Sequence, residues 1–128
     1  MTGKVVPARV EEFLLSHIDS VAQLEGLLLL RNEPEKRWTT EAIARRLYLS
    51  VDQTEPLLRR LAMQDLIGVD QGAAAYHYQP KTEDIRELID ELAEIYRKHL
   101  VAVTNLIHAK PRSRVQEFAD AFKFRKDD

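Results

Sequence analysis

The sequence has no cysteine among its 128 residues, which excludes disulfide bonds and thiolate metal ligands. It has only four glycines and five prolines, which favours a helix-rich chain over a β-sandwich or barrel. The first residues, MTGKVVPARVEEF, lack the apolar core of a signal peptide. The apolar run Leu27–Leu30 is far too short to span a bilayer. We therefore expect a cytoplasmic protein that makes no contact with membranes.

The chain also lacks an excess of positive charge, because its net charge is −2. A protein that grips DNA by its phosphates usually carries a basic footprint. Between Glu35 and Pro80, six basic residues are balanced by six acids. Any binding to DNA must therefore come from a local patch of cations.

Motifs that would mark an enzyme are missing as well. There is no glycine-rich phosphate loop and no GxSxG sequence. The four histidines, at positions 17, 77, 99 and 108, include no pair with the spacing of metal ligands on one helix. We expect no catalytic activity, no cofactor and no bound metal.

Hydrophobic periodicity and capping residues predict the local structure up to Pro80. Helices are expected at residues 10–18, 21–31, 41–47 and about 52–65, with a short strand at 38–39. Strands 66–69 and 73–78 are expected to form a hairpin, whose turn uses Gly72 at a positive φ. Thr40 is expected to cap the third helix, and Ser50 or Asp52 the fourth. Pro56 is tolerated in the fourth helix if that helix begins at residues 52–54; otherwise it produces a kink.

This order of elements over residues 21–78 resembles the winged helix-turn-helix domain of bacterial transcription regulators. The residues that carry the resemblance are Thr40-Glu41-Ala42-Ile43-Ala44, Leu47, Leu49-Ser50, Leu57, Leu61 and Leu66-Ile67. The resemblance implies a mainly α fold (α+β) with a two-stranded wing. It also implies that the fourth helix enters the major groove of DNA, with Gln53 and Arg59 as its main contacts and Gln53 as the base reader. Arg45, Arg46 and Arg60 would contact phosphates.

The chemistry of the same helix also supports a different reading. Asp52 and Glu55 would repel phosphates, although an acid can accept a hydrogen bond from cytosine. The wing tip, Asp70-Gln71-Gly72, has no Lys or Arg. The arginines themselves form either a phosphate-contacting patch or a solvated face paired with Glu41, Glu55 and Asp65. The alternative to a DNA-binding regulator is therefore a winged-helix adaptor that binds another protein.

After the domain of residues 1–80, apolar residues recur at the α-helical period until Pro111. They predict one long helix over residues 83–110, roughly 42 Å in length, which would project from its own domain. We expect this helix to pair with a second copy of the chain. Alternatively, the N-terminal helix and the tail fold back over it. The predicted homodimer interface is Ile85, Leu88, Leu92, Tyr96, Leu100, Val103 and Ile107.

Residues 111–128 form a charged tail with Val115, Phe118, Ala119 and Phe122 at the spacing of a short amphipathic helix. This segment is a candidate docking site for another protein through Phe118, Phe122 and Phe124.

Overall fold

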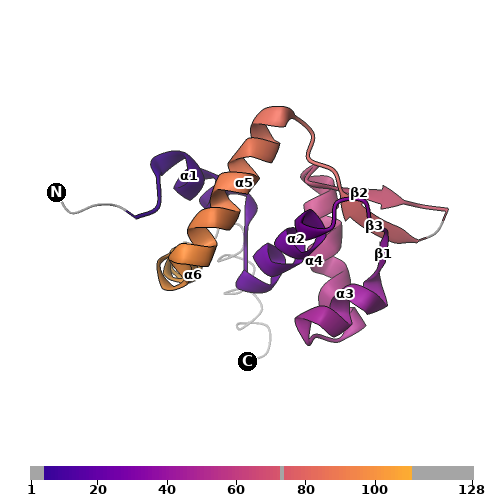
Figure 1. Cartoon of the computed structure of the whole chain (residues 1–128). Coiled ribbons are helices and arrows are strands. Elements are labelled where there is room, and N and C mark those ends of the chain that lie inside the picture. Colours follow the sequence, from indigo (N-terminus) through magenta and orange to yellow (C-terminus); the bar gives the residue numbers. More distant parts are fainter. Residues whose placement is uncertain (1–4, 73, 111–128) are drawn as a thin grey trace, which may run out of the picture.

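The computed structural model of the chain describes residues 5–72 and 74–110 (Figure 1). Their order of elements confirms the predicted mainly α architecture with a small sheet. The elements are α1 (Ala8–His17), α2 (Val21–Asn32), β1 (Trp38–Thr39), α3 (Thr40–Leu47), α4 (Val51–Met63), β2 (Ile67–Asp70), β3 (Ala75–Tyr78), α5 (Glu83–Lys98) and α6 (Leu100–Ala109).

The three strands form one antiparallel sheet in the order β1-β3-β2. Trp38 on β1 lies opposite Tyr76 on β3, so β1 extends the wing hairpin on the side away from β2. At the wing turn, Ala74 adopts a positive φ of 50°, whereas no described glycine has a positive φ. The expectation that Gly72 supplies this conformation was therefore wrong. β3 begins at Ala75, two residues later than predicted.

Helix α2 lies at the centre of the domain, as its nearly continuous apolar surface predicts. Leu24, Leu27 and Leu30 are fully buried, and α2 packs against α3, α4 and β3. Two polar contacts also tie it to α5. Tyr96 Oη donates a hydrogen bond to the Glu25 carboxylate, and Arg31 contacts Asp90 at 2.9 Å. The winged unit and the C-terminal helices therefore share one helix as their support.

The corner between α1 and α2 is held by Gln23, a buried polar residue. Its Oε1 accepts the Asp19 N–H at 2.7 Å, and its Nε2 donates to the His17 carbonyl at 3.1 Å. Its own N–H donates to Ser20 Oγ, which caps α2. Because the amide satisfies groups at the end of α1 and at the start of α2, it fixes the angle between the two helices.

The expectation of one continuous helix over residues 83–110 was wrong. Helix α5 ends at Lys98, and His99 has φ −133° and ψ 53°, which lie outside the helical region. Helix α6 then begins at Leu100 and packs against both α5 and α1 (Figure 1). The apolar side of α1 is what makes the break favourable, because Val103 and Ile107 become buried with Val10, Phe13 and Leu14. One part of the alternative is thus confirmed: the N-terminal helix α1 folds back over the apolar stripe.

Among the described residues, no single helix is long and apolar enough to cross a bilayer. Only α1 and α2 taken together meet that criterion, and they are bent by 109° relative to each other.

Helix α4 begins at Val51 with Ser50 as its N-cap, so Pro56 lies inside the helix and not in its first turn. The late start expected from the proline was wrong. Since proline has no N–H, the Asp52 carbonyl receives no helical hydrogen bond from position 56. The Ser50 cap and the burial of Leu58 and Leu61 stabilise α4 despite this interruption.

Replacing Pro56 with alanine should therefore stabilise the protein. The expected gain in the free energy of unfolding is up to ~3 kcal/mol, because the variant restores a helical hydrogen bond and removes a steric clash. Urea denaturation followed by circular dichroism measures it. Pro34→Ala, in the loop after α2, is the control and should instead lose about 0.4–1 kcal/mol through greater freedom of the unfolded chain. A Pro56→Ala variant no more stable than wild type would contradict this account.

Stability should also decline in alkali, because burial and the hydrogen bond to Glu25 raise the pKa of Tyr96 above its ordinary value. Burial likewise raises the pKa of Tyr78 to about 12. A phenol whose pKa is higher in the folded state than in the unfolded state contributes to the free energy of unfolding. This contribution is complete below the unfolded pKa, near 10, and falls as the pH rises above it. Urea denaturation between pH 8 and 11 should show this fall. Tyr96→Phe should make it shallower, with Tyr78 supplying the remainder; an unchanged slope would exclude Tyr96 as a source.

Candidate nucleic-acid interface

The helix-turn-helix is formed by α3, the turn at residues 48–50 and α4. Thr39, and not Thr40 as predicted, caps α3 by accepting the Ala42 N–H at 3.1 Å. Tyr48 ends α3 in the left-handed conformation, with φ 59° and ψ 41°, and this reverses the chain direction. Its side chain is 93% exposed. The turn therefore presents a large aromatic side chain to solvent beside the start of α4, which the sequence analysis did not single out.

Gln53, the predicted base-reading residue, is occupied by the helix cap. Its N–H donates to Ser50 Oγ at 3.1 Å, while its Oε1 accepts the Ser50 N–H at 3.0 Å. These two bonds form a capping box. Paired recognition of adenine requires both the oxygen and the nitrogen of the amide. In this arrangement Gln53 can read a base in that way only by giving up its role in the cap.

Arg59 and Arg60 on α4 are both paired with acids. Arg59 lies 3.7 Å from Glu55 one turn earlier, as the solvated-face alternative expects. Arg60 lies 3.3 Å from Asp19 at the α1–α2 corner, and Lys110 contacts the same carboxylate at 2.9 Å. The Arg60 side chain thus reaches toward the terminal helices. Both pairs are exposed, so each contributes little to stability, but each partly cancels a charge that was predicted to contact DNA.

Arg45 and Arg46, near the end of α3, have no such partner. Within residues 5–72 and 74–110, four basic residues have no carboxylate within 4.0 Å: Lys36, Arg37, Arg45 and Arg46. Every other Lys and Arg in these ranges lies within that distance of a carboxylate. All four are exposed. Glu41, one turn before Arg45, does not pair with it. The structure therefore places the uncompensated positive charge beside the helix-turn-helix and adds Lys36 and Arg37 to the predicted arginines.

The remaining outer face of α4 is acidic and apolar. Asp52 and Glu55 are exposed near its first turn, and Met63 at its last residue is 76% exposed. At the wing, Asp70, Gln71 and Gly72 carry no cation. Neither α4 nor the described part of the wing tip therefore offers an unpaired positive charge to a phosphate.

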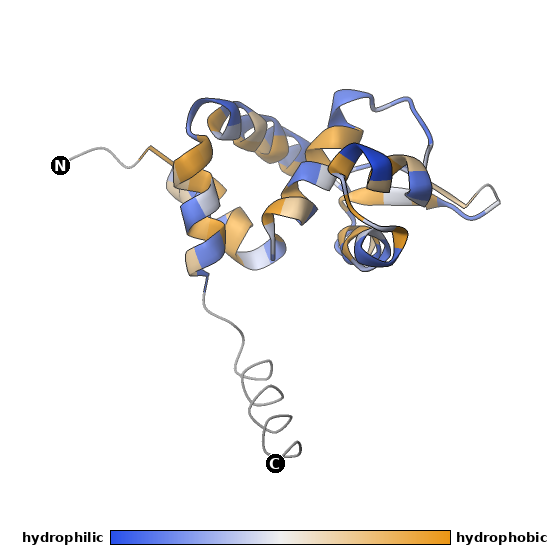
Figure 2. Cartoon of the chain, turned by 90° about the horizontal axis from the view of Figure 1, so that it is seen from below, coloured by the Kyte–Doolittle hydropathy of each residue, from blue (hydrophilic) through white to orange (hydrophobic). Residues whose placement is uncertain are grey.

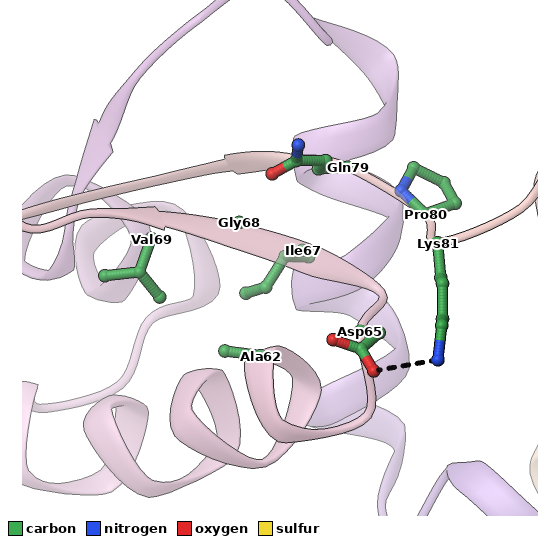
Figure 3. Close-up of a pocket in the computed structure, with 8 residues that line it drawn as sticks. All are labelled: Ala62, Asp65, Ile67, Gly68, Val69, Gln79, Pro80 and Lys81. Atoms are coloured by element: carbon green, nitrogen blue, oxygen red, sulfur yellow. Dashed lines mark ion pairs between the residues drawn. The ribbon is translucent and has the colours of Figure 1, made fainter.

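A shallow pocket of about 390 Å³ lies between the end of α4 and strand β2 (Figure 3). Ile67 and Val69 point from β2 toward Ala62 on α4, and the ion pair between Asp65 and Lys81 closes one end at 3.9 Å. None of the residues predicted to bind DNA lines this pocket.

The predicted dimer interface is divided by the break at His99. Leu92, Tyr96, Val103 and Ile107 are buried inside the single chain, so in this arrangement they cannot contact a second copy. Leu100 remains 52% exposed. Ile85 and Leu88 line an open groove of about 580 Å³ between α1 and α5, together with Phe13. Phe118, Phe122 and Phe124 lie outside the described residues.

Exposed apolar side chains are nevertheless present on the terminal helices and just before α1. Val101 is 68% exposed, Leu100 52%, Val5 46% and Leu15 39%. We call these four residues the terminal apolar patch, since α1 and α6 pack together. In Figure 2 hydrophobic turns are visible on the helices at the end of the molecule opposite the wing. This patch shares Leu100 with the predicted interface and offers apolar surface to a partner, and the predicted interface itself stays a prediction.

No protein-family model and no curated protein sequence matches this chain. Solved structures do match it. A MarR family protein from Bacillus stearothermophilus has 18% identity and a TM-score of 0.52, covering 93% of this chain and 81% of its own. A point mutant of S. aureus MepR has 18% identity and a TM-score of 0.52, covering 92% and 84%. Bordetella bronchiseptica BpsR, whose DNA binding is regulated by 6-hydroxynicotinic acid, has 16% identity and a TM-score of 0.51, covering 94% and 86%.

These similarities extend over nearly the whole chain, including the terminal helices, although the sequences have diverged widely. At such identities they establish the fold and leave the activity open. The chain is a winged helix-turn-helix protein with the fold of MarR-family transcriptional regulators.

Proposed function

We propose that this chain is a cytoplasmic, non-enzymatic transcriptional regulator that binds double-stranded DNA as a homodimer. The observation that carries the proposal is the group of four cations without carboxylate partners beside the helix-turn-helix: Lys36, Arg37, Arg45 and Arg46. Elsewhere in the described chain, positive charges are neutralised locally. A surface that leaves cations uncompensated is suited to a polyanion, and α4 would be the helix that enters the major groove.

Contacts with DNA would then be divided between two elements. Arg45 would neutralise a phosphate from the end of α3, while the first turn of α4 faces base edges. Asp52, exposed in that turn, is suited to accept a hydrogen bond from the amino group of cytosine. Tyr48, exposed in the turn between the helices, supplies an aromatic surface for contact with a thymine methyl group or a sugar. Because few charges participate, we expect modest affinity with a shallow dependence on salt.

Dimerisation would use the terminal apolar patch of Val5, Leu15, Leu100 and Val101. Burial of these side chains against a second copy would be favourable, because each is exposed to water in the single chain. The groove lined by Ile85, Leu88 and Phe13 would extend the same surface along α5. Two winged units held in this way would read two half-sites.

A second candidate function is a winged-helix adaptor that binds another protein. It is favoured by the outer face of α4, where Asp52, Glu55 and Pro56 are exposed and Gln53 is engaged in the cap. An acidic face with no free cation suits a basic partner better than a phosphate backbone. The two candidates differ in whether duplex DNA binds at all.

For the DNA-binding proposal, the wild-type protein should bind duplex DNA with an affinity that falls as salt increases. Arg45→Gln should reduce the magnitude of the slope of log K against log salt by about 0.9, because one phosphate contact is lost. Fluorescence anisotropy with a labelled duplex at several salt concentrations measures both. Arg60→Gln is the matched control, since Arg60 is paired with Asp19, which retains Lys110 as a partner in the variant. Absence of duplex binding by the wild type would reject the regulator and leave the adaptor.

For the dimer, Val101→Asp should give monomers at micromolar concentration, because an aspartate at the interface would have to be desolvated without a partner. Sedimentation velocity distinguishes the two masses. Met63→Asp replaces a similarly exposed apolar residue on α4, outside the terminal apolar patch, and should leave the dimer intact. A Val101→Asp protein that still sediments as a dimer, or a monomeric wild type, would exclude this interface.

A further inference from the structure

Trp38 is held rigidly at the edge of the wing sheet. It lies on β1, is only 2% exposed, and pairs with Tyr76 on β3. Its indole N–H has no acceptor among the described residues. The ring is therefore fixed by packing, and it is the chain's single tryptophan.

Two cations from separate elements are placed on this one ring. Lys36 Nζ, from the loop before β1, lies 3.9 Å from the ring centroid. Arg46 Cζ, from α3, lies 5.5 Å from the same centroid. Both contacts are attractive, because the face of an indole carries partial negative charge that attracts cations. The ring thus positions one cation from the loop before β1 and one from α3.

Among the described residues, no carboxylate lies within 4.0 Å of Lys36 or Arg46, so neither charge is neutralised by the chain itself. Glu35 and Glu41 are close in sequence, yet both side chains are exposed and form no ion pair there. A positive pair of this kind is completed by an external anion. A phosphate suits it, because a guanidinium bonds two phosphate oxygens in its plane and an ammonium adds a point charge.

We propose that Lys36 and Arg46, positioned by Trp38, form a clamp for a DNA backbone phosphate. This inference rests on the proposed function and assigns to the loop before β1 and to α3 a contact that the wing tip does not supply. The described tip residues Asp70, Gln71 and Gly72 carry no cation, whereas Lys36 lies just before β1, the edge strand on the side of β3 away from β2. It contacts phosphates and no bases, so it contributes affinity without sequence preference.

The test uses the full-length chain and labelled duplexes of several unrelated sequences. Lys36→Gln and Arg46→Gln should each reduce the magnitude of the salt slope by about 0.9 and weaken binding to all sequences alike. Arg60→Gln, whose arginine is paired with Asp19, is the control and should leave the slope nearly unchanged. Circular dichroism and thermal melting check that every variant is folded.

Trp38 supplies a second readout that a merely structural role of the two cations would not produce. Titration with duplex DNA should change the intrinsic fluorescence of the wild type, because the only indole lies beside the bound phosphate. The Lys36→Gln/Arg46→Gln double variant should lose most of this change. Inorganic phosphate at the same phosphate concentration should produce little, since it lacks the other contacts of the duplex.

Several results would overturn the clamp. If the affinity of the wild type for DNA falls with salt but both variants keep the same slope, the clamp is excluded while the proposed function stands. Loss of affinity for one sequence only would indicate a base contact instead. An equal response to inorganic phosphate would indicate a small-anion site. If the wild type binds no duplex at all, the clamp and the proposed function fail together.

Discussion

The burial of α2 is the constraint on which the rest of the structure depends. Leu24, Leu27 and Leu30 form the centre of the core, and the two helices of the helix-turn-helix pack on one side of them. Through Glu25 and Arg31 the same helix also contacts α5. Without α2, few contacts would fix the orientation of the winged unit relative to the C-terminal helices. The direction in which α4 faces is therefore set by a helix at the centre of the core.

Most of the fold could be predicted because its signals are local. The Ser50 cap, the leucines of α4 and the alternation in the wing act over a few residues, and the structure follows them closely. The break at His99 could not be predicted in the same way. The apolar period continues on both sides of it, and the energy that favours it comes from α1, far away in the sequence. Hydrophobic periodicity predicts which face is buried, but not against which partner.

The candidate site was predicted less well, for an equally physical reason. Sequence identifies which residues are cations, whereas function depends on which cations remain uncompensated. Arg59 and Glu55 are one helical turn apart, and their pairing was one of the alternatives that the sequence predicts. The pair of Arg60 with Asp19 spans the fold and was not. For Gln53 a signal existed, since a serine followed three residues later by glutamine is a capping box. Lys36 gained significance only when folding placed it on the ring of Trp38.

Asp19 receives Arg60 from α4 and Lys110 from the end of α6 through a single carboxylate. A swivel of the winged unit about the α1–α2 corner would have to stretch one of these contacts. Each of these ion pairs contributes only about 0–1 kcal/mol at an exposed site, so together they restrain the corner weakly. Small changes in the angle at the α1–α2 corner therefore cost little energy, even though the packing of α2 sets the average value of that angle.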